Sequence, residues 1–316
     1  MLAATPVTVP VPAILLVCLV LSAAPLAAAP SVVASIAPLH SLVAAVMGGV
    51  GTPRLLLRGG ESPHTFSLRP SDARMLHDAD VLFWIGPALE VPLQRILPGL
   101  GHVRSVAMLD AAGIQRLPVR ELDEPHTLPG DDHPAHEHDR DGRAVDPHIW
   151  LSPANAIAMA EEIARTLTAA DPANASHYRE NATRLVARLH ALDRDLGEQL
   201  AGIDGGYAVF HDAYQYLERR YGLHSAGTLT THPERSPGAA HLRSLQLRLA
   251  TDKVRCLFSE PQYQTRLLAM LGQGLELRHA VLDPLGADIT PGPEAYETLM
   301  RAIGDNLSAC LRGAAP

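Results

Sequence analysis

Three histidines, His64, His148 and His211, each stand just after an apolar run or just before a helical segment. Neutral imidazole suits zinc, and three protein nitrogens with one oxygen ligand make a tetrahedral zinc site. Asp283 ends a later apolar run and is the natural fourth ligand, although a water molecule could replace it. These residue types therefore indicate a zinc site, provided that the fold brings their separate loops together.

Two further carboxylates lie close to the histidines in the chain. Asp146 precedes His148 by two residues, and Asp212 follows His211 directly. Carboxylates in such places orient metal-bound imidazoles as hydrogen-bond acceptors, and we expect that role here.

Each of these residues also has a simpler explanation. A lone histidine in a loop is more often a surface or hydrogen-bonding residue than a ligand, and the closely spaced zinc signatures are absent. Asp283 together with Pro284 could be only a turn, and Asp212 could be the N-cap of a helix over residues 213–220.

The elements that must position the histidines follow from alternating short apolar runs and helical segments. Strands are predicted first at 32–36, 54–58, 81–85 and 103–106, and again at 207–210, 225–229, 256–258 and 280–282. Strands rich in Val, Ile and Leu that alternate with helices form buried parallel sheets, which hold ligands at the carboxyl ends of their strands. Helices are expected between them, at 38–47, 70–77, 92–97, 237–249 and 294–311.

Between the two groups of strands lie a helix at about 154–167 and a longer one to about residue 200. In the longer one Tyr178, Leu185, Leu189, Leu192 and Leu196 recur at helical spacing. The predicted fold is therefore α/β with two lobes, each a parallel sheet with flanking helices. A long rigid helix joins the lobes, and the metal site lies in the cleft between them. The predicted units are 30–152, the linking segment 153–203, and 204–316.

Composition narrows the class of partner. The 316 residues are 47% hydrophobic and 19% charged, which is typical of globular protein, and the net charge is −8. A negative chain is a poor partner for nucleic acid or an anionic membrane and is compatible with a cationic ligand.

The N-terminus predicts export. An apolar run at 13–21 is too short to span a membrane and leads to an Ala-x-Ala pattern near Ala29, so residues 1–29 are predicted to be a cleaved signal peptide. An uncleaved anchor is the alternative; Cys18 does not fit a lipid-attachment site because Val17 precedes it. Cleavage leaves Cys256 and Cys310, and two cysteines in an exported protein predict a disulfide; if the chain is not exported, they are two buried thiols.

Residues 121–143 form an acidic, Pro- and Gly-rich stretch from which no core can be built. It holds four histidines, His126, His133, His136 and His138. Imidazoles and carboxylates at close spacing bind divalent metals such as zinc weakly, so an accessory metal-binding loop is predicted, with a solvated spacer as the alternative.

Five motifs, SPHTFSLRPSD, DPHIWLSP, FHDAYQYLE, SEPQY and LDPLGADI, occur in this order. In them the chain resembles the ZnuA-like zinc-binding periplasmic components of bacterial ABC-type zinc uptake systems, within the wider family of metal-specific solute-binding proteins. The resemblance covers essentially the whole mature chain, including the His-rich loop and the cysteine pair. It implies two α/β lobes joined by a long helix, with one divalent ion between them.

The resemblance places the three histidine ligands of the family on His64, His148 and His211. The fourth ligand varies among members, and the Glu that some carry before the first histidine is Pro63 here, with Glu61 out of register. Relatives that bind manganese use carboxylates from both lobes, so a histidine-rich set with at most Asp283 favours zinc.

The resulting hypothesis is high-affinity capture of Zn²⁺ in the periplasm and delivery to an ABC permease and its ATPase, by a monomer without catalytic activity. Manganese or iron binding in the same family is one alternative, and an adhesin-like surface protein on the same fold is another. A third, from a different class, is a three-histidine zinc hydrolase. It needs an open coordination position with a general base beside it, and the sequence has no His-Glu-x-x-His helix.

Overall fold

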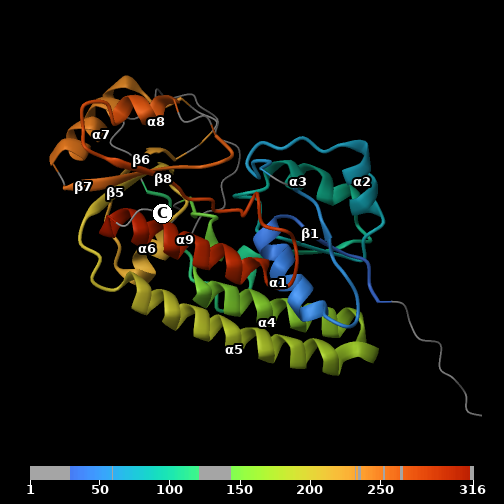
Figure 1. Cartoon of the computed structure of the whole chain (residues 1–316). Coiled ribbons are helices and arrows are strands. Elements are labelled where there is room, and N and C mark those ends of the chain that lie inside the picture. Colours follow the sequence, from blue (N-terminus) through green and yellow to red (C-terminus); the bar gives the residue numbers. More distant parts are fainter. Residues whose placement is uncertain are drawn as a thin grey trace, which may run out of the picture.

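The structure is a computed structural model that describes residues 29–58, 60–120, 144–231, 233, 236–251, 253–263 and 266–313. Two four-stranded sheets lie side by side, with two long helices running beneath them (Figure 1). The predicted α/β class, two parallel-sheet lobes with a long helix between them, is confirmed. The predicted boundaries between the units stay a prediction. The signal peptide lies almost wholly, and the His-rich loop wholly, outside the described residues.

The N-terminal lobe is built on a parallel sheet of strand order β2-β1-β3-β4. β1 and β3 are buried along their whole length, as expected of apolar strands covered on both faces. The strands are β1 (Val32–Ala34), β2 (Arg54–Leu55), β3 (Val81–Trp84) and β4 (Arg104–Ala107). The helices are α1 (Ala37–Met47), α2 (Pro70–His77) and α3 (Val91–Ile96).

The C-terminal lobe repeats this topology with the order β6-β5-β7-β8, again all parallel. In each lobe the first strand therefore lies between the second and the third. In sheets of this order ligands bind where the carboxyl ends of the first and third strands meet, and in this lobe these strands are β5 and β7. The strands are β5 (Gly206–His211), β6 (Ser225–Thr230), β7 (Val254–Ser259) and β8 (Arg278–Val281). The helices are α6 (Gln215–Tyr221), α7 (Ala239–Thr251), α8 (Arg266–Leu271) and α9 (Ala295–Arg312).

Two antiparallel helices, α4 (Pro153–Ala170) and α5 (Ala175–Leu200), underlie both lobes (Figure 1). Ser152 caps α4 by accepting a hydrogen bond from the backbone N–H of Asn155, and Pro153 occupies the first turn. α5 has 26 residues and spans about 40 Å. It buries all five apolar residues of the predicted stripe and packs against α4, α1 and α9.

α9 ties the two lobes together. Its buried face joins a core cluster that runs from β1 to the end of α9 and includes part of the C-terminal sheet, so the lobes share this part of their interior. Other residues of that sheet pack with α7 and α8 in a separate cluster. Tyr296 on α9 donates two hydrogen bonds to other elements: its backbone N–H donates to Ser41 of α1, and its hydroxyl donates to the carbonyl of Trp150. The predicted disulfide between Cys256 in β7 and Cys310 in α9 is present. Each helix in the described part of the chain falls short of the length or the apolar character that a membrane span requires.

Several elements begin or end one or two residues from the predicted bounds, such as α7 at Ala239–Thr251 instead of 237–249. β2 has two residues, although the N–H groups of Leu56 and Leu57 still donate to the carbonyls of Ala34 and Ser35 as the chain bends away. The helix after His211 begins only at Gln215, and α8 was not predicted.

Candidate metal site

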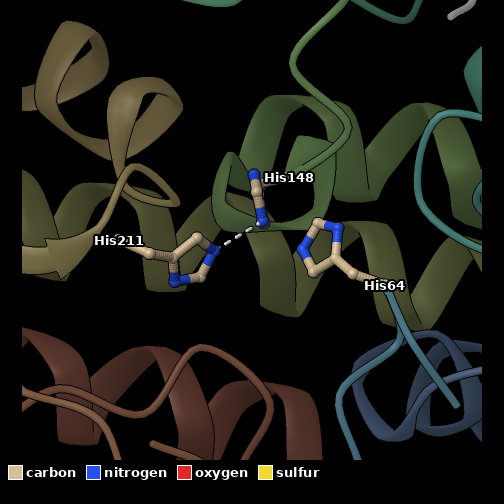
Figure 2. Close-up of side chains that lie close together, drawn as sticks. All are labelled: His64, His148 and His211. Carbon is tan, nitrogen blue, oxygen red and sulfur yellow. Dashed lines mark hydrogen bonds between the residues drawn. The ribbon is translucent and has the colours of Figure 1, made fainter. Parts of the chain in front are cut away.

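The structure brings the three predicted histidines together between the lobes. One side-chain nitrogen of each lies within 4.8 Å of the others, and the Nε2 atoms of His148 and His211 are 3.0 Å apart. Figure 2 shows the three rings converging from three separate segments of the chain. Three zinc-bound nitrogens in a tetrahedral site would be roughly 3.3 Å apart, so small side-chain movements would bring this group to zinc geometry.

Each histidine comes from a different kind of element. His211 is the last residue of β5, and His148 is the residue before the short 3₁₀ helix Ile149–Leu151 that leads into α4. Both side chains are buried. His64 reaches the site from the loop between β2 and α2 and is half-buried, so it is the most accessible of the three histidines.

The loop that carries His64 is tied to the opposite lobe. The hydroxyl of Tyr263, which follows β7, donates to the hydroxyl of Ser62 at 3.1 Å. The Tyr263 ring stacks on Phe210 and meets the ring of His211 edge-on at 6.0 Å between centroids. Tyr263 therefore packs on one histidine segment and holds the loop of another.

Buried carboxylates hold two of the imidazoles. The Nδ1 atom of His148 donates to Asp146 at 2.7 Å, as predicted from their spacing. The Nδ1 atom of His211 donates to both oxygens of Glu260, at 2.8 and 2.9 Å, and the backbone N–H of His211 donates to the same carboxylate. A carboxylate on Nδ1 fixes the tautomer with a proton on that atom and leaves Nε2 free to bind a metal.

This arrangement favours a cation at the centre of the group. With protons on both Nδ1 atoms, the Nε2 lone pairs of His148 and His211 face each other at 3.0 Å. Two lone pairs this close repel unless a proton or a metal ion lies between them. Nitrogen ligands from three imidazoles suit zinc better than manganese, calcium or magnesium, which prefer more oxygen ligands.

Burial and charge shift the pKa values of these groups in different directions. Burial, with the nearby His211, lowers the pKa of His148 well below its ordinary value, so this ring stays neutral. Burial lowers the pKa of His211 as well, but the charge of Glu260 and its hydrogen bond raise it, and the net pKa lies above the ordinary value. Burial raises the pKa of Asp146 to about 7, against the effect of its hydrogen bond to the His148 backbone and the charge of Arg120.

Asp283 does not join the three histidines in the structure. Its Oδ1 accepts hydrogen bonds from the Gln262 side chain at 2.7 Å and the Leu285 backbone at 2.9 Å, and its Oδ2 accepts from the backbone of Ala287 at 2.5 Å. Both oxygens thus organise the turn after β8, and the ligand role predicted for Asp283 is not seen in this arrangement.

Asp212 likewise faces away from the imidazoles. Its carboxylate pairs with Arg120 at 2.7 and 3.0 Å, and the same guanidinium pairs with Glu218 at 2.6 Å. The orienting role that the sequence suggested for Asp212 belongs to Glu260 instead. The reason is geometric: successive residues at the end of a strand point to opposite sides, so Asp212 points away from the ring of its neighbour.

The stems of the His-rich loop are anchored beside the site. Pro118 and Val145 form an antiparallel bridge, and the hydroxyl of Tyr216 on α6 accepts from the Leu117 backbone and donates to the carbonyl of Asp146. Arg120, at the start of the loop, reaches the acids described above. The histidines of the loop itself, His126, His133, His136 and His138, lie outside the described residues.

The sequence pattern alone assigns no role to Glu260, Gln262, Tyr263 or Arg120. Glu260 and Gln262 belong to a motif that directly follows a predicted strand, which was a usable signal. The contact with His211 becomes visible only when β7 is known to pair with β5. Arg120 carried no signal, because it precedes a polar stretch and its partners are 92 and 98 residues away.

The chain is similar in sequence and in fold to known proteins. The model of the family described as "ZnuA: Zinc-uptake complex component A periplasmic" matches residues 32–310. The chain is 40% identical over 312 residues to a protein of Brucella abortus named high-affinity zinc uptake system protein ZnuA, covering 89% of this chain and 91% of the relative. A protein of the same name from Paracoccus denitrificans is 36% identical, with 89% and 92% covered. A solved structure titled "Crystal structure of ZnuA" shares the fold, with a TM-score of 0.73, 24% identity, and 90% and 99% of the two chains covered.

Proposed function

The chain belongs to the ZnuA family of periplasmic zinc-uptake components, and from this premise we propose that it captures Zn²⁺ in the periplasm and delivers it to an ABC-type importer. The observation that carries the proposal is the meeting of three imidazole nitrogens, two of them backed by buried carboxylates, at one point between the lobes. His64, His148 and His211 are the proposed ligands.

Binding rather than catalysis fits this site. A zinc hydrolase needs a free general base beside the open coordination position. Among the described residues, the two carboxylates that touch the ligands, Asp146 and Glu260, already accept hydrogen bonds from Nδ1 atoms and from backbone N–H groups. Manganese or iron transport is disfavoured because the converging ligands are nitrogens.

The rest of the transport role follows from the family and the sequence. We propose export by a cleaved signal within residues 1–29, work as a monomer, and docking to a permease coupled to an ATPase. The core shared by the lobes supports small movements of loops, such as the one that holds His64, rather than a wide hinge opening. The His-rich loop would collect zinc weakly and pass it to the tight site.

The proposal is tested by zinc uptake in a bacterial strain that lacks its own component of this kind. The full chain should restore growth under zinc limitation, and the triple variant His64→Ala, His148→Ala, His211→Ala should not. Restoration by manganese transport alone, measured as cellular metal content, would contradict the proposal.

The proposed role of the loop has a separate test. Deletion of residues 124–143 should leave one tight zinc bound and should slow uptake only when zinc is scarce. Unchanged uptake under zinc starvation would show that the loop is a spacer.

A further inference from the structure

Gln262 lines the same pocket as the three histidines and presents an oxygen without a partner. The pocket between the lobes is walled by His64, His148 and His211 together with Gln262, Tyr263 and Pro284. The Gln262 Oε1 atom is buried and has no hydrogen-bond partner among the described residues. A buried amide oxygen without a donor costs free energy, and such an atom calls for a physical explanation.

Asp283 sets the orientation of the Gln262 amide. The Gln262 Nε2 donates to Asp283 Oδ1 at 2.7 Å. An ionised carboxylate oxygen accepts hydrogen bonds and cannot donate them. An inverted amide would therefore place Gln262 Oε1 against Asp283 Oδ1, and the two oxygens would repel each other. The hydrogen bond therefore directs Nε2 toward the carboxylate and leaves Oε1 as an acceptor away from it.

Asp283 itself is engaged by three donors, two of them backbone N–H groups of the turn that it organises. To become a metal ligand it would have to give up some of these hydrogen bonds and rebuild that turn. Three imidazoles leave one position of a tetrahedral zinc open, and a neutral oxygen ligand can fill it without any such change.

We propose that Gln262 is a positioning residue for the fourth zinc ligand, which is a water molecule that donates a hydrogen bond to Gln262 Oε1. This inference rests on the proposed function, because it needs zinc on the three histidines. In this proposal Asp283 acts indirectly, because it orients the Gln262 amide through its hydrogen bond with Nε2. A neutral acceptor holds the ligand as water rather than as a bound carboxylate, which keeps the donor set rich in nitrogen and suited to zinc over manganese.

The test compares the variants Gln262→Leu and Asp283→Asn with the wild-type chain by zinc competition titration and by the visible spectrum of the Co²⁺ form. Gln262→Leu should weaken zinc binding about tenfold, as is typical when an outer partner of a metal ligand is lost, and should shift the Co²⁺ absorption. Asp283→Asn keeps an oxygen that can accept from Gln262 and should have the smaller effect. Gln273→Leu, at an exposed position of the same lobe, serves as the control.

Equal zinc affinity in Gln262→Leu and the wild type would overturn the inference while leaving the zinc site intact. A larger loss in Asp283→Asn than in Gln262→Leu would also overturn it, because the Gln262 oxygen would then not be the group that controls the fourth ligand. Absence of tight zinc binding in the wild type would instead refute the proposed function. A crystal structure of the zinc-loaded chain gives a second readout. It should show a zinc-bound water within hydrogen-bond distance of Gln262 Oε1, and an Asp283 oxygen on the zinc would contradict the proposal.

Discussion

Replacing Glu260 by Gln tests how far the carboxylate behind His211 sets zinc affinity. Glu260 is only 2% exposed, and both of its oxygens accept from the Nδ1 atom of His211. Glutamine keeps the shape and one accepting oxygen but removes the charge. Loss of such a partner typically lowers metal affinity about 10- to 100-fold, which corresponds to about 1.4–2.7 kcal/mol. We expect a loss in this range at a pH above the raised pKa of His211, where the ring is neutral in both proteins.

The same substitution should change how zinc affinity depends on pH. Burial lowers the pKa of His211 and Glu260 raises it, with a net increase, so in the wild type zinc must displace a proton once the pH falls through that raised pKa. Affinity then drops about tenfold per pH unit for one displaced proton. Without the charge of Glu260 the pKa falls, and the affinity of the variant should stay flat to lower pH. The two curves should therefore approach each other as the pH decreases.

The assay is zinc competition against a calibrated chelator at several pH values between 6 and 8. The exposed Glu276→Gln, in the same lobe, is the matched control and should follow the wild type throughout. Two results would contradict this expectation: an unchanged zinc affinity of Glu260→Gln at a pH above the raised pKa of His211, or a constant ratio between variant and wild type across the whole pH range.

Two further predictions concern stability. Replacing Cys256 and Cys310 by Ser removes a crosslink between residues 54 apart and should lower the free energy of unfolding by about 4 kcal/mol in the chain-entropy model. Urea denaturation of the oxidised wild type and of the variant measures the difference. Equal denaturation midpoints would contradict the prediction. Arg120→Ala leaves the buried Asp212 and Glu218 without their shared cation and should cost about 2 kcal/mol, below the range for fully buried pairs because Arg120 is 38% exposed. Adding Glu218→Gln should recover part of that loss, and no recovery would show that the charges are not the cause.

The sequence predicted most of the fold because buried parallel strands and capped helices leave strong local signals. α2 has the predicted bounds, and α4 begins at the predicted Ser-Pro cap. α8 escaped prediction because it is a single short helix of Arg266–Leu271 without a distinctive stop. The shared core was also not foreseen, because periodicity shows that a helix such as α9 buries one face but not which lobe covers it.

Residue type and position relative to the predicted strands were enough to predict part of the site. The three histidines and the pairing of Asp146 with His148 depend on local context, and the structure brings them together. The positions of Asp283 and Glu260 depend on side-chain direction at strand ends and on which strands are neighbours. Glu260 meets His211 only because β7 lies beside β5, across 49 residues of sequence.

The most direct test of the account is a zinc titration of the mature chain beside the triple variant His64→Ala, His148→Ala, His211→Ala. The matched control replaces three exposed histidines, His177, His190 and His224, by Ala. We expect one tight zinc in the wild type and in the control, and none in the site variant. Tight zinc binding that survives the loss of His64, His148 and His211 would contradict it.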